Sequence, residues 1–407
     1  MKCADVIVVG GGAAGLICAG TSARRGKKVI VLEKMSRPAR KILVTGKGRC
    51  NLTNNVPVDD LISAVRRNNR FLYGAFNILN AQDTMALFES LGVPLKTERG
   101  NRVFPVSERA MDVADALVRY AEYADIRHNE AEELFFDSGF VKGVRCSDGQ
   151  AFQAESVVIA TGGLSYPGTG STGDGYRLAE HAGHTVTTQK PSLVPIVCKE
   201  PWCTDLMGLS LRNVTLSLYE TGKKKPLYQE MGEMIFTHFG ISGPLVLSAS
   251  TYMQKEIELY RIAIDLKPAL DTETLDGRIL RDLGKYSAKD TKNAFVDLLP
   301  HTLIPVILKL ADIDGRIKAH QLARDQRRSL LEAIKGMLLT PAALRPVEEA
   351  VITAGGVMVS EVDPKTMASK KVSGLYFAGE VLDVDARTGG FNLQIAFSTG
   401  YVAGMNC

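Results

Sequence analysis

The sequence predicts an α/β protein in which a discontinuous Rossmann-like domain encloses a barrel-like β module and a helical subdomain. Three observations predict this fold. A glycine motif follows the first apolar strand, a second nucleotide-type motif lies at 374–380, and the chain changes character near Lys190. The chain therefore leaves the nucleotide-binding domain and later completes it. We expect the parts to span 1–190, 191–270, 271–345 and 346–407.

Composition is that of a soluble globular protein, because 45% of the residues are hydrophobic and 23% are charged. The 407 residues suffice for two or three domains. A net charge of +4, with basic clusters at 66–67, 223–225 and 327–328, permits an RNA partner without requiring one. The seven cysteines form no CxxC pair and show no metal-ligand pattern, which favours a reducing cytoplasm. No segment is predicted to span a membrane or to act as a signal peptide.

The first part begins with a βαβ unit, predicted as a strand at 5–9, a helix at 13–25 and a strand at 29–32. After a loop at 34–55, the patterns predict helices at 82–91 and 107–123, an antiparallel meander at 126–152, a strand at 156–160 and a helix at 174–184. Ser107 and Asp174 are the predicted N-caps of their helices.

The inserted part changes from strands to helices. Short strands broken by turns are predicted over 193–265, and short helices over 271–340. Strands return at 350–353 and 375–378, and a final helix is predicted from Phe391 to Ala403. The last strand and helix belong to the second part of the nucleotide-binding domain.

The motif Gly10-x-Gly12-x-x-Gly15 follows a strand and opens a helix, which is the context that dinucleotide binding requires. The three glycines allow a tight turn, close approach of phosphate, and close packing of helix on strand. The helix N-terminus offers N–H groups to the pyrophosphate. Glu33 ends the second strand, where a carboxylate can accept hydrogen bonds from ribose and disfavours a 2′-phosphate. The predicted contacts are Gly10, Gly12, Ala13, Ala14, Gly15, Glu33 and Lys34.

The second motif favours FAD over NAD, because an NAD-dependent dehydrogenase needs no such motif near its other end. Glu380 can accept a hydrogen bond from a ribityl hydroxyl. The run 388–392 leads into the final helix, whose positive N-terminal end can face the flavin N1/C2 edge. The predicted contacts here are Thr161, Gly162, Gly379, Glu380, Asp383, Gly389, Gly390, Phe391 and Asn392. No second GxGxxG indicates a separate nicotinamide domain, so NAD(P)H is expected to bind transiently at the flavin face.

The loop at 45–54 is the most unusual segment of the chain. Gly48 allows close backbone approach, Arg49 can pair with phosphate, and Asn51 can hydrogen-bond flavin or ribityl oxygens. Lys41, just before the loop, adds positive charge.

At this loop the sequence resembles the BaiN/RdsA family of FAD-dependent oxidoreductases. The matching runs are 10–15, 41–54, 232–244, 379–383 and 389–394. One departure is Lys47, where a glycine is expected more often. The resemblance implies a split FAD domain with an inserted β module and helical subdomain. It also implies either dihydrouridine formation in large-subunit ribosomal RNA or a reductive step in bile-acid dehydroxylation.

His238 and Cys50 are the candidate catalytic residues. An imidazole near a flavin can donate the proton that reduction of a conjugated C=C requires, and a thiol can protonate the carbon next to the hydride acceptor. The alternatives are a histidine that fixes the domain junction and a small thiol packed beside the phosphate-binding backbone. Ser242 is predicted to cap a helix that contains Gly243 and Pro244 in its first turn.

The sequence therefore predicts a cytoplasmic FAD-dependent oxidoreductase that transfers hydride to an unsaturated ring, with uridine in ribosomal RNA as the first candidate and NAD(P)H as the donor. A small steroid-like enone is the second candidate acceptor. A flavin-bound redox sensor without turnover is the third hypothesis. The motifs do not determine whether the donor is NADH or NADPH, or which oligomeric state the protein forms.

Overall fold

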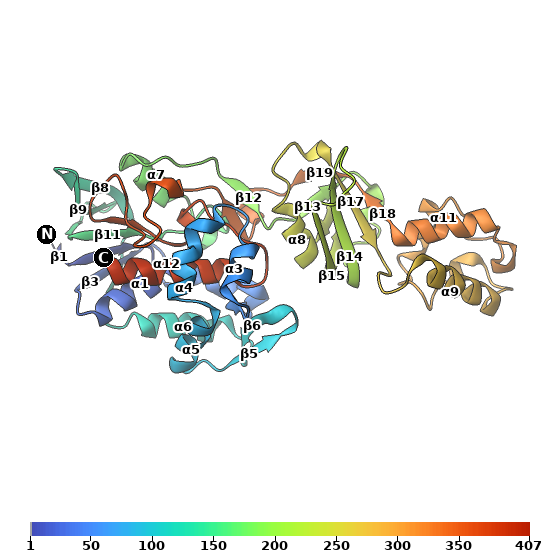
Figure 1. The fold of residues 1–407 in the computed structure, drawn as a ribbon, viewed down its shortest axis with the longest axis horizontal. Coiled ribbons are helices and arrows are strands. Elements are labelled where there is room, and N and C mark those ends of the chain that lie inside the picture. Colours follow the sequence, from blue (N-terminus) through green and yellow to red (C-terminus); the bar gives the residue numbers. More distant parts are fainter. Residues whose placement is uncertain (1) are drawn as a thin grey trace. The chain divides into compact units, whose positions relative to one another are not determined.

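The computed structural model describes residues 2–407 and divides into two compact units. The first unit runs to Ser192 and resumes with Pro346–Cys407, and the second is Leu193–Arg345. Figure 1 shows that the first unit contains both the blue amino-terminal and the red carboxyl-terminal elements.

The first unit is built on a five-stranded parallel sheet with the order β21-β11-β2-β3-β7. The strands are β2 (Val6–Val9), β3 (Val29–Glu33), β7 (Asp125–His128), β11 (Ser156–Ile159) and β21 (Leu375–Phe377). The apolar runs of β2, β3 and β11 are buried, as parallel strands covered on both faces require. Because β21 pairs with β11, the segment after the insert completes the sheet, which confirms the predicted discontinuous domain.

Strand β7 corrects the predicted meander at 126–152. It pairs in parallel with β3 at the edge of the main sheet, so only the later strands are antiparallel. These are β8 (Ala131–Asp137), β9 (Phe140–Cys146) and β10 (Ala151–Gln153), and β10 also pairs with β1 (Lys2–Cys3). The short, polar β7 has no apolar run that could have shown its place in a buried sheet.

Two small sheets complete the first unit. One is β4 (Thr53–Asn54), β6 (Arg102–Pro105) and β5 (Leu95–Glu98) in that order, and the other pairs β12 (Lys190–Ser192) with β20 (Ile352–Ala354). The last pair joins the segments where the chain leaves and re-enters the unit.

Helix α1 (Ala13–Arg24) packs directly on the last helix, α12 (Phe391–Asn406). A Cβ on Gly400 would lie 2.3 Å from the Ala14 carbonyl oxygen, and one on Gly404 would lie 2.6 Å from that of Cys18. The two glycines therefore allow the backbones to touch. The remaining helices are α2 (Arg40–Val44), α3 (Val58–Ala64), α4 (Tyr73–Ile78), α5 (Ala81–Ser90), α6 (Ala110–Tyr120) and α7 (Asp174–His181).

Three predicted N-caps are wrong. Helix α6 begins after Arg109, since Ser107 accepts a hydrogen bond only from the Arg109 N–H, before the helix. Asp174 is the first residue inside α7, and the left-handed Gly173 precedes it. Ser242 lies in a strand, and Gly243 takes the cap position. In the last two cases, a glycine with positive φ occupies the N-cap position that the sequence assigns to a polar side chain.

The second unit combines a seven-stranded antiparallel sheet with helices around one hydrophobic core. The sheet order is β18 (Met337–Leu339), β17 (Tyr260–Asp265), β14 (Ser210–Glu220), β15 (Tyr228–Thr237), β16 (Gly240–Ser242), β13 (Ile196–Cys198) and β19 (Pro341–Leu344). The helices are α8 (Pro244–Ser250), α9 (Thr272–Lys285), α10 (Ile304–Leu310) and α11 (Arg324–Lys335). Within the described residues, no pairing joins the edge strands β18 and β19, so the module does not close into a barrel.

Among residues 2–407, no helix has both the length and the apolar character needed to cross a bilayer.

Candidate functional site

The loop between β2 and α1 has the three glycines in different environments. Gly10 has a left-handed φ of 102°, and a Cβ there would lie 2.6 Å from the Ala160 carbonyl oxygen. A Cβ on Gly15 would lie 1.9 Å from the Gly10 carbonyl oxygen. At Gly12 a Cβ would meet nothing within 4 Å. Gly10 and Gly15 therefore serve the turn and the packing, while Gly12 lies on an open backbone surface that a phosphate could approach.

Helix α1 begins at this open surface, and no side chain caps its N-terminus. Its free N–H groups and partial positive charge suit an anion. Ala13 and Ala14 form the first turn and add no charge there.

Glu33 organises the end of β3. One carboxylate oxygen accepts the Gly11 N–H at 2.8 Å and the other accepts the Met35 N–H at 2.7 Å. The carboxylate is therefore fixed next to the glycine loop and keeps further acceptor capacity. The next residue, Lys34, is held by Asp174 at the start of α7 and by Thr172.

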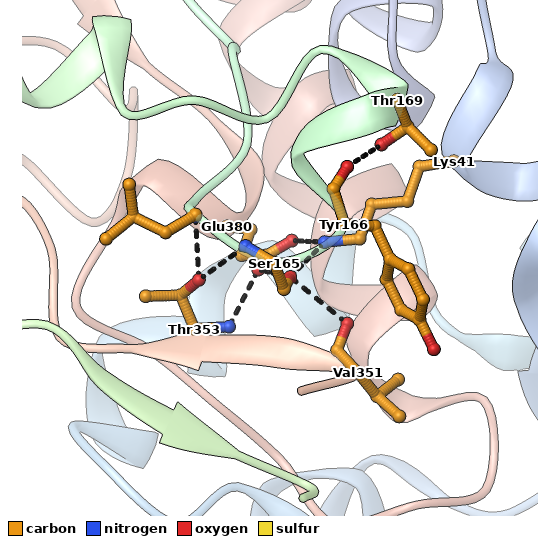
Figure 2. A network of polar contacts seen from close by, with 8 residues as sticks. Lys41, Ser165, Tyr166, Thr169, Val351, Thr353 and Glu380 are labelled. Atoms are coloured by element: carbon orange, nitrogen blue, oxygen red, sulfur yellow. Dashed lines mark hydrogen bonds and ion pairs between the residues drawn. The ribbon is translucent and has the colours of Figure 1, made fainter. Parts of the chain in front are cut away.

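Glu380 lies just after β21, at the centre of the polar network in Figure 2. One of its oxygens accepts the Lys41 ammonium at 2.7 Å, and the other accepts the Ser165 hydroxyl at 3.0 Å and the Thr353 N–H at 2.8 Å. Lys41 also donates to Ser165 at 2.6 Å. We call Lys41, Ser165, Thr353 and Glu380 the interior network. It joins four segments that are far apart in the sequence.

Thr161 and Gly162 follow β11 beside this network. The Thr161 hydroxyl is buried and has no hydrogen-bond partner in the protein. Such a group is costly unless something satisfies it, so it indicates a ligand or an ordered water at this position. Gly162 has a φ of 76°, and a Cβ there would press on Ser171 at 3.0 Å.

Two glycines lead into α12. Gly389 and Gly390 have φ values of 127° and 95°, and a Cβ on Gly390 would lie 2.4 Å from the Thr53 carbonyl. The Asn54 side chain donates to the Gly389 carbonyl at 2.9 Å. In the amide orientation that gives both side-chain atoms a partner, the Asn51 oxygen accepts the Gly390 N–H at 3.1 Å and its nitrogen donates to the Thr53 carbonyl at 3.2 Å. The 45–54 loop and the start of α12 thus lie side by side.

Other predicted cofactor residues near α12 have structural partners. Asn392 donates to the Ala386 carbonyl and accepts its N–H, both at 2.9 Å, so its amide fixes the preceding loop. Phe391 is buried. The Asp383 carbonyl accepts from Asn68 at 2.7 Å, and its carboxylate lies 3.8 Å from Arg67. Gly379 packs against α1, where a Cβ would lie 2.8 Å from that of Ala14.

The helix packing sets the length of the site. Gly400 meets Ala14 and Gly404 meets Cys18, so α1 and α12 run in parallel with a constant register. Since α1 begins at Ala13, one residue before Ala14, and α12 begins at Phe391, the N-terminus of α12 lies roughly 12 Å beyond that of α1 along the helix axis, at about 1.5 Å per residue. Two positive helix ends, separated by an elongated span with the interior network in the same unit, suit an extended dinucleotide.

Arg49 is engaged by protein carboxylates. It contacts Glu98 at 2.5 Å and Glu108 at 3.1 Å, and its guanidinium stacks 4.2 Å from the Phe104 ring centre. The Glu98 carboxylate raises the pKa of Arg49, and Arg49 in turn lowers the pKa of Glu98. Lys96 contacts the same two carboxylates. We call Arg49, Lys96, Glu98 and Glu108 the surface network. Gly48 precedes it with a left-handed φ of 83°.

The two catalytic candidates have opposite environments. Cys50 is fully buried with a φ of 58°, and burial raises the pKa of its thiol to about 12. This thiol stays protonated at neutral pH but has no exposed surface. His238 is exposed in the turn between β15 and β16 of the second unit, where its ring contacts Phe239. Both catalytic roles remain predictions.

Comparison with known proteins now decides the family. Residues 4–406 match the family described as HI0933-like protein Rossmann domain. The chain belongs to this family. A 3-dehydro-bile acid delta(4,6)-reductase from Clostridium scindens is 32% identical, with 98% of this chain and 97% of that protein covered. The ribosomal RNA dihydrouridine synthases of Escherichia coli and Haemophilus influenzae are 30% and 32% identical, over 98% of this chain and 96% and 97% of theirs.

Solved flavoproteins share the fold at low sequence identity. A flavocytochrome c3 fumarate reductase matches with a TM-score of 0.55 and 16% identity, covering all of this chain and 78% of that one. A 3-ketosteroid-delta4-(5alpha)-dehydrogenase from Rhodococcus jostii has the same TM-score and identity, covering all of this chain and 96% of the other. These matches support the Rossmann-type architecture.

Sequence reasoning missed Ser165, Thr353 and Asn54 as site residues. Ser165 comes two residues after the predicted Thr161-Gly162-Gly163 turn, so its proximity could have been inferred. Asn54 lies within the unusual loop. No local sequence pattern marks Thr353 as a site residue, because its N–H contacts the site through Glu380, which lies 27 residues further along the chain.

Proposed function

We propose that this protein is an FAD-dependent oxidoreductase that delivers hydride to an unsaturated ring, with uridine in large-subunit ribosomal RNA as the acceptor and NAD(P)H as the donor. The observation that carries the flavin assignment is the parallel register of α1 and α12, which offsets two uncapped helix N-termini by about 12 Å along the helix axis in one unit. Full-length identity to reductases and to ribosomal RNA dihydrouridine synthases supports the reaction class.

The residues present fit FAD. The open backbone at Gly12 and the α1 N-terminus would take the pyrophosphate, and Glu33 would accept from the ribose. The interior network and the unpartnered Thr161 hydroxyl would meet the ribityl chain. The α12 N-terminus would face the electron-rich edge of the ring system. Once bound, FAD supplies a ring that accepts hydride from a nicotinamide and passes it to an electron-poor C=C bond.

The protein must supply charge stabilisation and a proton. The partial positive charge of the α12 N-terminus favours negative charge on a neighbouring ring. Lys41 provides a full positive charge, held in place by Glu380 and Ser165. Saturating a C=C bond needs one proton besides the hydride, and we propose His238 as its donor before Cys50, because the Cys50 side chain is fully buried.

A small enone is the second candidate acceptor. It is favoured by the 32% identity to the bile-acid reductase over nearly the full length of both chains. Both acceptors present an electron-poor C=C bond next to a carbonyl, so the same residues could serve either.

The deciding experiment is anaerobic photoreduction of the purified protein, followed by reoxidation with ribosomal RNA fragments and a panel of enones in parallel. We expect a yellow protein that RNA reoxidises with formation of dihydrouridine, detected by nucleoside mass spectrometry. If enones reoxidise the reduced flavin and RNA does not, the acceptor is a small enone rather than RNA. A protein that stays colourless after refolding with FAD would overturn the flavin assignment.

A further inference from the structure

Two cysteines that the proposed function does not use meet where α1 packs on α12 (Figure 1). Cys18 lies in α1, and Cys407 caps the end of α12, with its thiol hydrogen-bonded to that of Cys18. A Cβ on Gly404 would lie 3.1 Å from the Cys18 Cα, so the two backbones are in contact one turn before Cys407. Residues three apart share a helix face and helical side chains lean towards the N-terminus, which brings the Cys407 thiol back to Cys18.

The buried Ser22 hydroxyl joins the two helices at this point. Its oxygen lies 3.0 Å from the Cys18 carbonyl oxygen and 3.1 Å from that of Gly404. It also lies 3.1 Å from the Cys407 sulfur, which fixes that sulfur at the helix interface. A disulfide requires Cα atoms within about 7 Å and side chains that point towards each other. The contact of the two backbones and of the two thiols provides the closeness that such a bond needs.

The surroundings favour a thiolate at Cys407 rather than at Cys18. The hydrogen bond from Cys18 lowers the pKa of Cys407, and the Ser22 hydroxyl and the positive charge of Arg25 lower this pKa further. Arg25 donates to the main-chain oxygens of Gly404 at 2.9 Å and of Cys407 at 3.2 Å, so its guanidinium lies at the end of α12. The contact with Cys407 and burial raise the pKa of the Cys18 thiol. The pair therefore combines one nucleophilic thiolate with one thiol that keeps its proton.

A second thiol pair, in the other unit, has the opposite surroundings. Cys198 ends β13, and its thiol is hydrogen-bonded to that of Cys203. This contact, burial and the negative charge of Glu200 all raise the pKa of Cys198. Because a negative charge disfavours a thiolate, two adjacent thiols do not by themselves make a reactive pair. Cys198 and Cys203 therefore serve as an internal control.

We propose that Cys18 and Cys407 are a redox-active thiol pair, which a peroxide oxidises to a disulfide that locks α1 to α12. Cys407 is 5% exposed and Cys18 is fully buried, so a small oxidant reaches Cys407 first. The Cys407 thiolate attacks one peroxide oxygen, the O–O bond breaks, and a sulfenic acid forms as hydroxide leaves. The Cys18 sulfur then displaces the hydroxyl group of the sulfenic acid, which departs with the Cys18 proton as water. Two electrons thus pass from the two sulfurs to the peroxide.

The disulfide would fix the register of the two helices whose N-terminal ends form the candidate FAD site. It goes beyond the proposed reaction, because neither cysteine belongs to the interior network or to the surface network. It closes a loop that includes almost the whole chain, and long closed loops restrict the unfolded state most. Oxidation should therefore stabilise the protein.

The test treats the purified protein with hydrogen peroxide and maps its cysteines by peptide mass spectrometry without reductant. We expect a linked Cys18–Cys407 peptide and a rise in Tm of about 5 °C that dithiothreitol reverses. Cys407→Ser should show neither the linked peptide nor the rise. In Cys18→Ser, Cys407 should stop at the sulfenic acid and be trapped by dimedone. The control Cys203→Ser should behave like the unchanged protein.

The proposal is overturned if peroxide links Cys198 to Cys203 and leaves Cys407 unmodified, or if Cys407 is oxidised without a bond to Cys18. It is also overturned if the linked peptide forms with no change in Tm, because the bond would then lock nothing. The unchanged protein decides each of these outcomes, so the test stands even if a variant fails to fold. Flavin absorbance of the same sample keeps the two assignments apart, since a colourless protein that forms the disulfide would contradict only the FAD assignment.

Discussion

The interior and surface networks use the same chemistry in different surroundings. In each, a cation lies between polar partners, with Lys41 at 2.7 Å from Glu380 and Arg49 at 2.5 Å from Glu98. The Lys41 and Glu380 side chains are 23% and 19% exposed, whereas those of Arg49 and Glu98 are 32% and 27% exposed and that of Glu108 is 48% exposed. Burial makes the first network part of the site's architecture, while the second remains open to solvent and to partners.

The comparison shows why residue type alone does not assign a role. Both Arg49, inside the glycine-rich loop at 45–54, and Lys41, just before it, are predicted from the sequence to serve the cofactor. Lys41 contacts Glu380, itself a predicted flavin residue, but Arg49 turns to two carboxylates and the Phe104 ring. The partners of each cation, which come from elsewhere in the chain, separate the two functions.

The largest effect is expected when a Cβ is added where the backbone at the start of α12 contacts Thr53. Gly390→Ala should destabilise the protein by about 3 kcal/mol or more and abolish flavin binding, because its Cβ would collide with Thr53 at 2.4 Å. Gly100→Ala in the β5–β6 turn is the matched control. Gly100 is also left-handed, with a φ of 76°, but its Cβ would meet nothing, so the cost should be about 1 kcal/mol.

Denaturant unfolding and flavin absorbance of the folded fraction measure both glycine variants. If Gly390→Ala and Gly100→Ala lose the same stability and the same flavin binding, only the left-handed backbone conformation matters. The contact between the 45–54 loop and α12 would then not position the flavin.

The second-largest effect is expected when one carboxylate of each network is replaced by a neutral amide. Glu380→Gln leaves the Lys41 ammonium half-buried without its counter-charge, and we expect a loss of about 2–3 kcal/mol together with weaker flavin binding. Glu108→Gln is the control, and it should leave the melting temperature unchanged because exposed ion pairs contribute little. Calorimetry with and without added FAD gives both quantities. A larger loss from Glu108→Gln would reverse the roles of the two networks.

Much of this architecture could be predicted from local sequence patterns. The strands at 6–9, 29–33 and 156–159 are apolar runs, and the glycine motifs mark the turns at which each nucleotide contact begins. Strand β7 was misassigned because an edge strand with polar residues lacks that run. The caps at Gly173 and Gly243 were missed because left-handed glycines replaced the expected polar side chains.

The interior network could be predicted only in part. Glu380 and Lys41 were each identified from their motifs, but 339 residues separate them, and only the folded sheet brings them together. The carboxylate partners of Arg49 lie on β5 and before α6, where no local pattern distinguishes them from ordinary surface acids. Pairing across such sequence distances depends on tertiary structure.

The third prediction contrasts an interior thiol with a surface thiol. Cys50 is fully buried and Cys3 is exposed, so iodoacetamide at pH 8 should label Cys3 and leave Cys50 unmodified until the protein unfolds. The pKa of Cys50 is raised by burial from 9.0 to about 12, so the stability from its neutral thiol is intact below pH 9 and declines between pH 9 and about 12. Cys50→Ser should remove that part of the alkaline decline.

Peptide mass spectrometry after timed labelling measures the two thiols in the same sample. Rapid modification of Cys50 in the native protein would show that a substrate could reach it, and would restore it as a proton donor ahead of His238.

The smallest effect should appear when the surface network is made more basic. Glu108→Gln removes one of the two carboxylates that face Arg49 and Lys96 and so makes the surface network more positive by one charge. Since counterion release scales with the positive charge that faces the phosphates, RNA affinity should rise by about twofold, and the gain should shrink as salt is raised. The control is Glu361→Gln, which neutralises an acid of the same unit that pairs with Lys371 outside the surface network, and it should leave RNA affinity unchanged. A gain of equal size from Glu361→Gln would mean that RNA senses only the total charge of the protein, and the distinction between a structural interior network and a substrate-facing surface network would then lose its functional meaning.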